Sequence, residues 1–134
     1  MKFKFLPHTA DVKFQAYGKT LEEVFENSVL ALINRICSDK IESREKIKFK
    51  VKGRDLEALM YNFLEEFLYL VDAKQFLASE VKVKIKNKKE LEAEILGDSS
   101  EEYALEMHIK AITYNEMFVK EISGKWVAQV VLDV

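Results

Sequence analysis

The sequence is poor in the residues that punctuate or cross-link a chain, with one cysteine, one proline and four glycines in 134 residues. A single cysteine excludes a disulfide framework within the chain and a zinc site built on cysteines. So little proline and glycine leaves no room for a flexible linker or a low-complexity tail. We therefore expect one domain over residues 1–134, a length that suits one hydrophobic core.

Long apolar runs and a strong excess of one charge are also absent. No apolar run approaches the ~20 residues of a membrane span, and the N-terminal MKFKFL is too short and too charged for a signal peptide. We therefore expect a cytoplasmic protein with no membrane partner. The formal net charge is −2, whereas a protein that coats nucleic acid through many phosphate contacts is normally basic.

The short motifs that mark common active sites are missing. The chain has no Walker loop, G-x-G-x-x-G, H-E-x-x-H or G-x-S-x-G. Two histidines and one cysteine leave few members for a nucleophile–histidine pair. Cys37 falls on the apolar face of a predicted helix, where we expect a buried small hydrophobic side chain rather than a thiolate.

The sequence does contain clear alternation of apolar and charged residues, which predicts strands. Helical spacing predicts two helices, over residues 19–38 with Thr20 as N-cap and over residues 56–73 capped by Asp55. The last strand, residues 125–134, is apolar nearly throughout, so we expect it to be central and to follow a tight turn at Ser123-Gly124. The sum is an α+β, two-layer domain with two helices packed on a mixed, mostly antiparallel sheet of about six to seven strands.

The segment EVKVKIKNKKELEAEILG, residues 80–97, predicts a hairpin with its turn centred on Lys88. In that register three lysines face three glutamates: Lys82 to Glu94, Lys84 to Glu92 and Lys86 to Glu90. Each such pair contributes a few tenths of a kcal/mol, and a slip of one residue would bury the lysines. We therefore interpret the lysine run as a solvated strand face rather than a nucleic-acid patch.

Two stretches combine residue types that are unusual for a strand. In PHTAD, residues 7–11, proline breaks a strand, and residue types alone favour a turn in which Thr9 and Asp11 satisfy loop amides. In KAITY, residues 110–114, Lys110 and Tyr114 share one strand face. That pattern is compatible with a site, although a snorkelling surface lysine is the commoner case.

The chain closes on VVLDV, which places the carboxylate of Asp133 next to the α-carboxylate of Val134. These negative groups either splay into solvent or hold a cation between them, and oxygen ligands suit a hard divalent ion. Asp11 opens an early strand and Asp133 closes the last one. If those strands are antiparallel neighbours, both carboxylates lie at the same end of the sheet and form a two-acid metal site.

Five segments together resemble the archease family, in the same order and spacing along essentially the whole chain: HTADVKFQAYGKTLEEVFENSVLALINRI, DLEALMYNFLEEFLYL, GD, KAITY and a terminal LDV. The resemblance implies a small non-enzymatic protein that activates RtcB-type RNA ligases in tRNA splicing and RNA repair. It also implies that the protein promotes guanylylation of the ligase histidine with GTP, broadens nucleotide use, and meets RNA only through the ligase.

The resemblance further implies a bound divalent cation, calcium in the family, while oxygen ligands leave Mg²⁺ and Mn²⁺ open. The implied ligands are Asp11, Asp133 and the main-chain oxygen of Val134. Lys110 matches a functional lysine that reaches toward the ligase or a phosphate. The residues that would surround the ligands without binding the ion are His8, Thr9 and Tyr114.

The chain departs from the family pattern between residues 97 and 115. Gly97-Asp98 stands where Gly-Glu is usual, and Asn115 replaces a frequent histidine, so His108 receives no role. Two other functions stay open from the residues alone. One is a metal-dependent hydrolase of phosphate esters that uses the same two acids. The other is an RNA-binding, chaperone-like module.

Overall fold

The computed structural model describes all 134 residues and contains two α-helices and seven strands. Their bounds are β1 (Phe3–Leu6), β2 (Val12–Gly18), α1 (Leu21–Ile36), β3 (Glu45–Lys52), α2 (Leu56–Lys74), β4 (Phe76–Lys86), β5 (Glu90–Ser99), β6 (Ala111–Ile122) and β7 (Lys125–Asp133). A short 3₁₀ turn, Ser100–Glu102, follows β5. Both predicted caps are confirmed, because the Glu23 amide donates to Thr20 Oγ1 and the Ala58 amide donates to Asp55 Oδ1.

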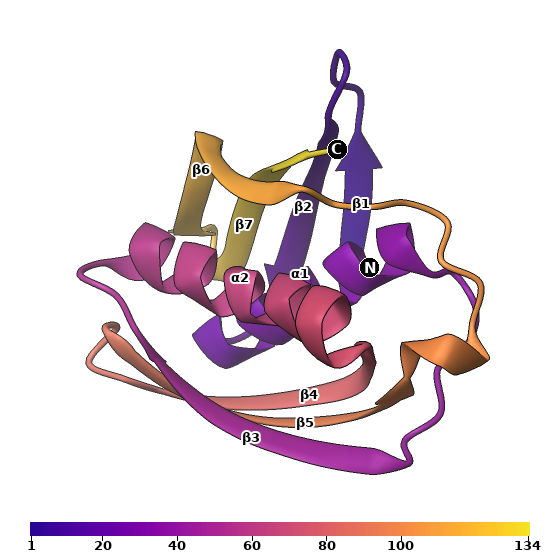
Figure 1. Ribbon diagram of the computed structural model, residues 1–134. Coiled ribbons are helices and arrows are strands. Elements are labelled where there is room, and N and C mark those ends of the chain that lie inside the picture. The colour runs from indigo at the N-terminus through magenta and orange to yellow at the C-terminus, as the bar shows by residue number, and fades with distance from the viewer.

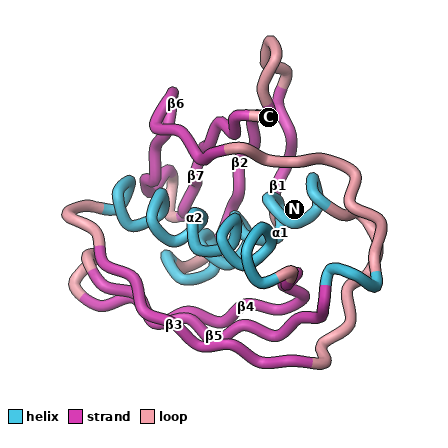
Figure 2. Tube along the Cα trace, in the orientation of Figure 1, coloured by secondary structure: helices cyan, strands magenta, loops and turns pink.

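The strands form two sheets, ordered β1-β2-β7-β6 and β3-β5-β4, and every strand pair is antiparallel. The two helices lie between the sheets (Figure 1), and the tube view shows the same three layers (Figure 2). The α+β class with two helices on antiparallel strands is confirmed. The prediction of a single mixed sheet in a two-layer domain is wrong, because the alternation of residues along a strand shows which face is buried but not which strands are its neighbours.

The core fills the space around the helices. Its largest fully buried side chains include Phe14 of β2, Phe25 of α1, and Phe63 and Phe67 of α2. Phe63 and Phe67 meet edge to face, with ring centroids 5.1 Å apart, a preferred aromatic geometry. Cys37 is buried in the same core, as predicted. Neither helix is long and apolar enough to cross a membrane.

The predicted hairpin register between β4 and β5 is confirmed in the three pairs Lys82–Glu94, Lys84–Glu92 and Lys86–Glu90. β5 is nevertheless the central strand of its sheet, so its glutamates also have lysines of β3 on the other side. The ion pairs within 4 Å are made there: Lys46–Glu94 at 3.0 Å, Lys50–Glu92 at 3.5 Å and Lys52–Glu90 at 3.9 Å.

Asp98, at the end of β5, is a buried carboxylate. Its Oδ2 accepts hydrogen bonds from the Tyr103 hydroxyl at 2.8 Å and from Arg44 Nη1 at 2.9 Å. The Tyr103 hydrogen bond, helped by the Ser99 amide and by Arg44, lowers the pKa of Asp98. This group ties the start of β3 to the segment that follows β5, which gives Asp98 a structural role.

Substitution of Gly97 by alanine tests the close packing of β4 on β5. A Cβ at Gly97 would lie 2.1 Å from the Leu77 carbonyl oxygen and 2.6 Å from the Phe76 ring. We expect Gly97→Ala to lower the free energy of unfolding by about 2–3 kcal/mol, measured by urea denaturation. Gly124→Ala is the control, because its φ is +78° and no atom lies within 4 Å. It should cost about 1 kcal/mol, and equal losses would contradict the packing argument.

Candidate functional site

Pairing of β2 with β7 brings two acids far apart in sequence to one end of the larger sheet. β7 lies between β2 and β6, so the predicted central position of the last strand is confirmed. Val12 pairs with Leu132 at the end of the ladder, and Asp11 and Asp133 are the next residues outward. The C-terminus accordingly lies beside the β1–β2 loop (Figure 1). We call Asp11, Asp133 and Val134 the acidic tip.

The carboxylate of Asp11 accepts no hydrogen bond from the backbone of its own loop. No loop amide donates a hydrogen bond to the side chain of Asp11 or of Thr9, so the turn role favoured by residue types is not what these side chains do. Ala10, just before Asp11, has φ +67°, a left-handed conformation that costs an L-residue roughly 1–2 kcal/mol. Strain of this kind often accompanies a functional position.

His8 links Asp11 to a second charged group. His8 Nε2 donates to Glu116 Oε2 over 2.9 Å, and Lys13 Nζ donates to Glu116 Oε1 over 3.0 Å. His8 Nδ1 is buried without a hydrogen-bond partner and lies 3.8 Å from Asp11 Oδ2. His8 thus stands beside Asp11. Because its Nε2 already donates to Glu116, its Nδ1 carries a proton for the Asp11 carboxylate only in the imidazolium form.

Glu116 is the residue of this cluster that sequence reasoning missed. It lies in a bulge of β6: between the pairs Thr113–Val131 and Phe118–Gln129, β6 advances by five residues and β7 by two. Gln129 Nε2 donates to the Glu116 carbonyl over 2.8 Å and holds the bulge. The polar Asn115-Glu116 pair, which interrupts a strand of alternating residues, is the signal that could have found it.

Lys110 reaches the acidic tip through its backbone. Its amide donates to the Asp133 carbonyl over 2.7 Å and so fixes the end of β7. Because Ala111 pairs with Asp133, alternation directs the Lys110 side chain to the opposite face. There it lines a surface hollow together with Glu66 and Tyr69 of α2. A contact of Lys110 with phosphate or a partner stays a prediction.

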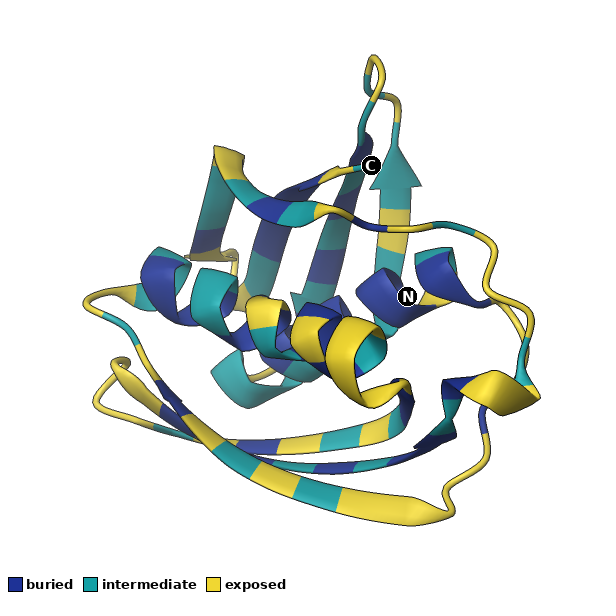
Figure 3. Ribbon diagram, viewed as in Figure 1, coloured by how far each residue is buried: buried dark blue, intermediate teal, exposed yellow.

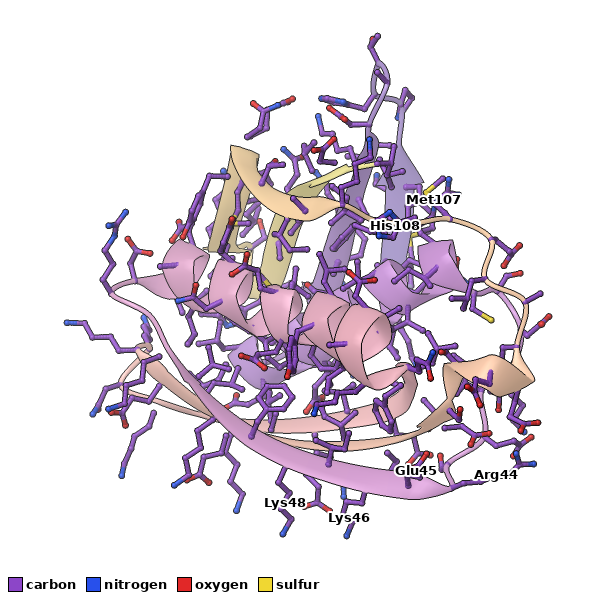
Figure 4. All side chains as sticks on the ribbon, in the orientation of Figure 1. Arg44, Glu45, Lys46, Lys48, Met107 and His108 are labelled. Atoms are coloured by element: carbon purple, nitrogen blue, oxygen red, sulfur yellow. The ribbon has the colours of Figure 1, made fainter.

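Tyr114 packs against α2 instead of the acidic tip. Its ring stacks on Tyr61 with centroids 4.3 Å apart and an interplanar angle of 6°. His108 lies on the extended segment that crosses the molecule (Figure 4). Its Nε2 is 3.7 Å from Asp72 Oδ1, with both side chains exposed. These contacts fasten β6 and the segment before it to α2.

The oxygen atoms at the acidic tip match the ligands of a hard divalent cation. Asp11 and Asp133 supply carboxylates, and Val134 supplies a main-chain oxygen. No three His, Cys, Asp or Glu side chains converge on one metal position, so two carboxylates need the main-chain oxygen and water to complete a coordination shell. Such a donor set suits Ca²⁺, Mg²⁺ or Mn²⁺ rather than zinc.

The hydrogen bonds from His8, and then those from Lys13, lower the pKa of the Glu116 carboxyl. We expect this pKa, followed by the ¹³C shift of the Glu116 carboxyl, to rise toward the usual value of about 4.3 in His8→Ala. A pKa lowered in the folded state adds stability above the unfolded-state value and loses it as the pH falls through the folded value.

The unfolding free energies of wild type and His8→Ala should therefore converge on acidification below about pH 4. Glu94, whose pKa is lowered by the hydrogen bond from Lys46 on the other sheet, is the internal control and should titrate alike in both proteins. An unchanged pKa of Glu116 in the variant would contradict the His8–Glu116 interaction.

Comparison with known proteins assigns the family. The model of the Archease protein family (MTH1598/TM1083) matches residues 3–134. The protein archease of Methanosarcina mazei is 39% identical over 140 residues, covering 99% of this chain and 96% of its own length. The protein archease of Pyrococcus furiosus is 41% identical over 134 residues, covering 95% and 94%.

Two solved structures share the fold. The solution structure of Methanobacterium thermoautotrophicum protein 1598 matches with a TM-score of 0.81 at 30% identity, covering 99% of both chains. The crystal structure of a Thermotoga maritima archease, described as a possible chaperone, matches with a TM-score of 0.69 at 17% identity, covering 98% and 96%. On the family model and the sequence relatives, this chain belongs to the archease family.

Proposed function

We propose that this protein is a non-enzymatic, cytoplasmic activator of an RtcB-type RNA ligase, and that it promotes guanylylation of the ligase through a divalent cation held at the acidic tip. The observation that carries the proposal is the antiparallel register of β2 and β7, which sets Asp11 and Asp133 at one end of the sheet. Membership of the archease family supports the choice of partner.

The position of the acidic tip suits an activator. The β1–β2 loop projects beyond the sheet, with the C-terminus at its side (Figure 1), so Asp11 can enter a cleft of a larger partner. When bound, a divalent cation would offset the negative charge of a nucleoside triphosphate during phosphoryl transfer. Asp11 and Asp133 would hold it, and His8 would orient the Asp11 carboxylate.

The surroundings of the acidic tip favour an activator over a hydrolase. His8 is the histidine beside Asp11, and its Nε2 is already bound to Glu116, which in turn binds Lys13. Two carboxylates can hold a single ion, and the neighbouring imidazole is already hydrogen-bonded to Glu116, so this site offers neither a free general base nor a second metal ion to activate water. An activator needs neither, because its partner supplies the reacting groups.

Removal of either carboxylate at the acidic tip tests the proposal. We expect Asp11→Asn and Asp133→Asn each to lower the stimulated rate of ligase guanylylation at least tenfold, because each removes a charged ligand and leaves the backbone in place. The measurement is transfer of radiolabelled GMP from GTP to a cognate RtcB-type ligase.

Asp39→Asn is the matched control, since Asp39 is exposed in the α1–β3 connection and the substitution removes the same charge. It should stimulate like wild type, and circular dichroism should show all three variants folded. Full stimulation by Asp11→Asn and Asp133→Asn would contradict the proposal. Phosphatase activity of the isolated wild-type protein that these substitutions abolish would favour the hydrolase instead.

A further inference from the structure

The face of the β3-β5-β4 sheet that points away from the helices is basic. We call it the lysine face; its charged residues are Lys46, Lys48, Lys50, Lys52, Lys82, Lys84, Lys86, Glu80, Glu90, Glu92 and Glu94. Seven lysines and four glutamates give it a net charge of +3. The rest of the chain then holds 14 of the 21 Lys and Arg and 19 of the 23 Asp and Glu, a net charge of −5.

The lysine face is open to solvent. Lys46 and Lys48 point away from the helices (Figure 4), and burial colouring shows exposed residues alternating along the outer sheet (Figure 3). The face lies on the far side of the helical layer from the sheet that bears the acidic tip (Figure 1). The two charged surfaces are therefore free to bind different partners at the same time.

Glutamates neutralise less than half of the lysines on this face. Glu90, Glu92 and Glu94 each lie within 4 Å of one lysine, and all three of those lysines belong to β3. Four lysines have no carboxylate within 4 Å: Lys48, Lys82, Lys84 and Lys86. In the β4–β5 hairpin alone, lysines and glutamates are equal in number. The lysines of β3 face the same glutamates from the other side, so positive charge is in excess on this face.

The lysines are spaced for a polymer of phosphates rather than for one small anion. Alternate residues of a strand stand about 6.6 Å apart, and β3 and β4 flank β5 at about 4.8 Å each. Lys48 and Lys50 of β3 and Lys82 and Lys84 of β4 line a surface depression over β5. Its lining also includes the carboxylates Glu92 and Glu94 of β5 and Glu26 of α1. Two parallel rows of cations are complementary to an extended phosphodiester backbone.

The face carries no platform for stacking bases. The large exposed hydrophobic side chains of the chain lie elsewhere, and its exposed tyrosines, Tyr69 and Tyr114, belong to α2 and β6. Proteins that bind single strands combine basic grooves with aromatic side chains, whereas double-stranded RNA is recognised largely by shape and backbone. Charge without aromatic side chains therefore favours a duplex.

We infer that the lysine face binds the phosphate backbone of double-stranded RNA directly and without sequence preference. The choice of RNA over DNA rests on the proposed function, whereas binding to the duplex backbone rests on the lysine face alone. The inference departs from two expectations drawn from the sequence: that the protein meets RNA only through the ligase, and that the lysine run of β4 is a solvated strand face rather than a nucleic-acid patch.

Fluorescence anisotropy of a fluorescein-labelled 20-base-pair RNA duplex with the full chain in 50 mM KCl tests this inference. We expect saturable binding that weakens with salt, with a log–log slope of about −3 to −4 for four phosphates at about −0.9 each. The variant Lys48→Gln, Lys82→Gln, Lys84→Gln, Lys86→Gln should bind at least tenfold more weakly and show a flatter slope.

The matched control replaces four exposed lysines outside the face: Lys2→Gln, Lys4→Gln, Lys19→Gln and Lys40→Gln. It has the same net charge and should stay within threefold of wild type. No binding by wild type, or equal weakening in both variants, would overturn the inference, as would tighter binding to a single-stranded RNA or to a DNA duplex of the same sequence. The assay contains no ligase and measures no guanylylation, so failure of this inference is distinguishable from failure of the proposed function.

Discussion

The pairing of β2 with β7 is the interaction on which the rest of this structure depends. It runs from Val12–Leu132 to Gly18–Trp126 and joins the first part of the chain to the last. The buried Phe14 and Val130 form one of its rungs. A slip of one residue would turn those side chains to the other face, so the packing of the core fixes the register. The relative position of Asp11 and Asp133 follows from that register. Packing of the core therefore determines the geometry of the acidic tip.

The two ends of the domain carry opposite charge, and the net charge of −2 hides this division. The acidic tip sits on the loop side of one sheet, and the lysine face covers the outside of the other (Figure 1). The helical layer lies between the two sheets, shares its core with both, and keeps the two charged surfaces apart. In our account one end offers a cation to a ligase site while the other holds the backbone of an RNA duplex, and neither role requires the domain to change shape.

Much of the fold follows from local patterns, because those patterns reflect local physics. Thr20 and Asp55 begin helices by capping them, and the register of Lys82 with Glu94 follows from alternation and a short turn. The division into two sheets does not follow from local patterns, since the sequence of an alternating strand such as β3 does not show which strand pairs with it. Asp11 and Asp133 could be paired in advance because one strand is nearly all apolar and therefore central. Glu116 could not, because a bulge in β6 delivers it to His8, and the register of a bulge depends on tertiary contacts such as that of Gln129.

The central claim, that the acidic tip holds a divalent cation, is tested most directly by long-wavelength anomalous diffraction from crystals of the protein grown with CaCl₂. Our account predicts an anomalous peak about 2.3–2.6 Å from carboxylate oxygens of both Asp11 and Asp133 and from a main-chain oxygen of Val134. Calcium bound elsewhere, or well-ordered carboxylates at both positions with no anomalous peak between them, would contradict it.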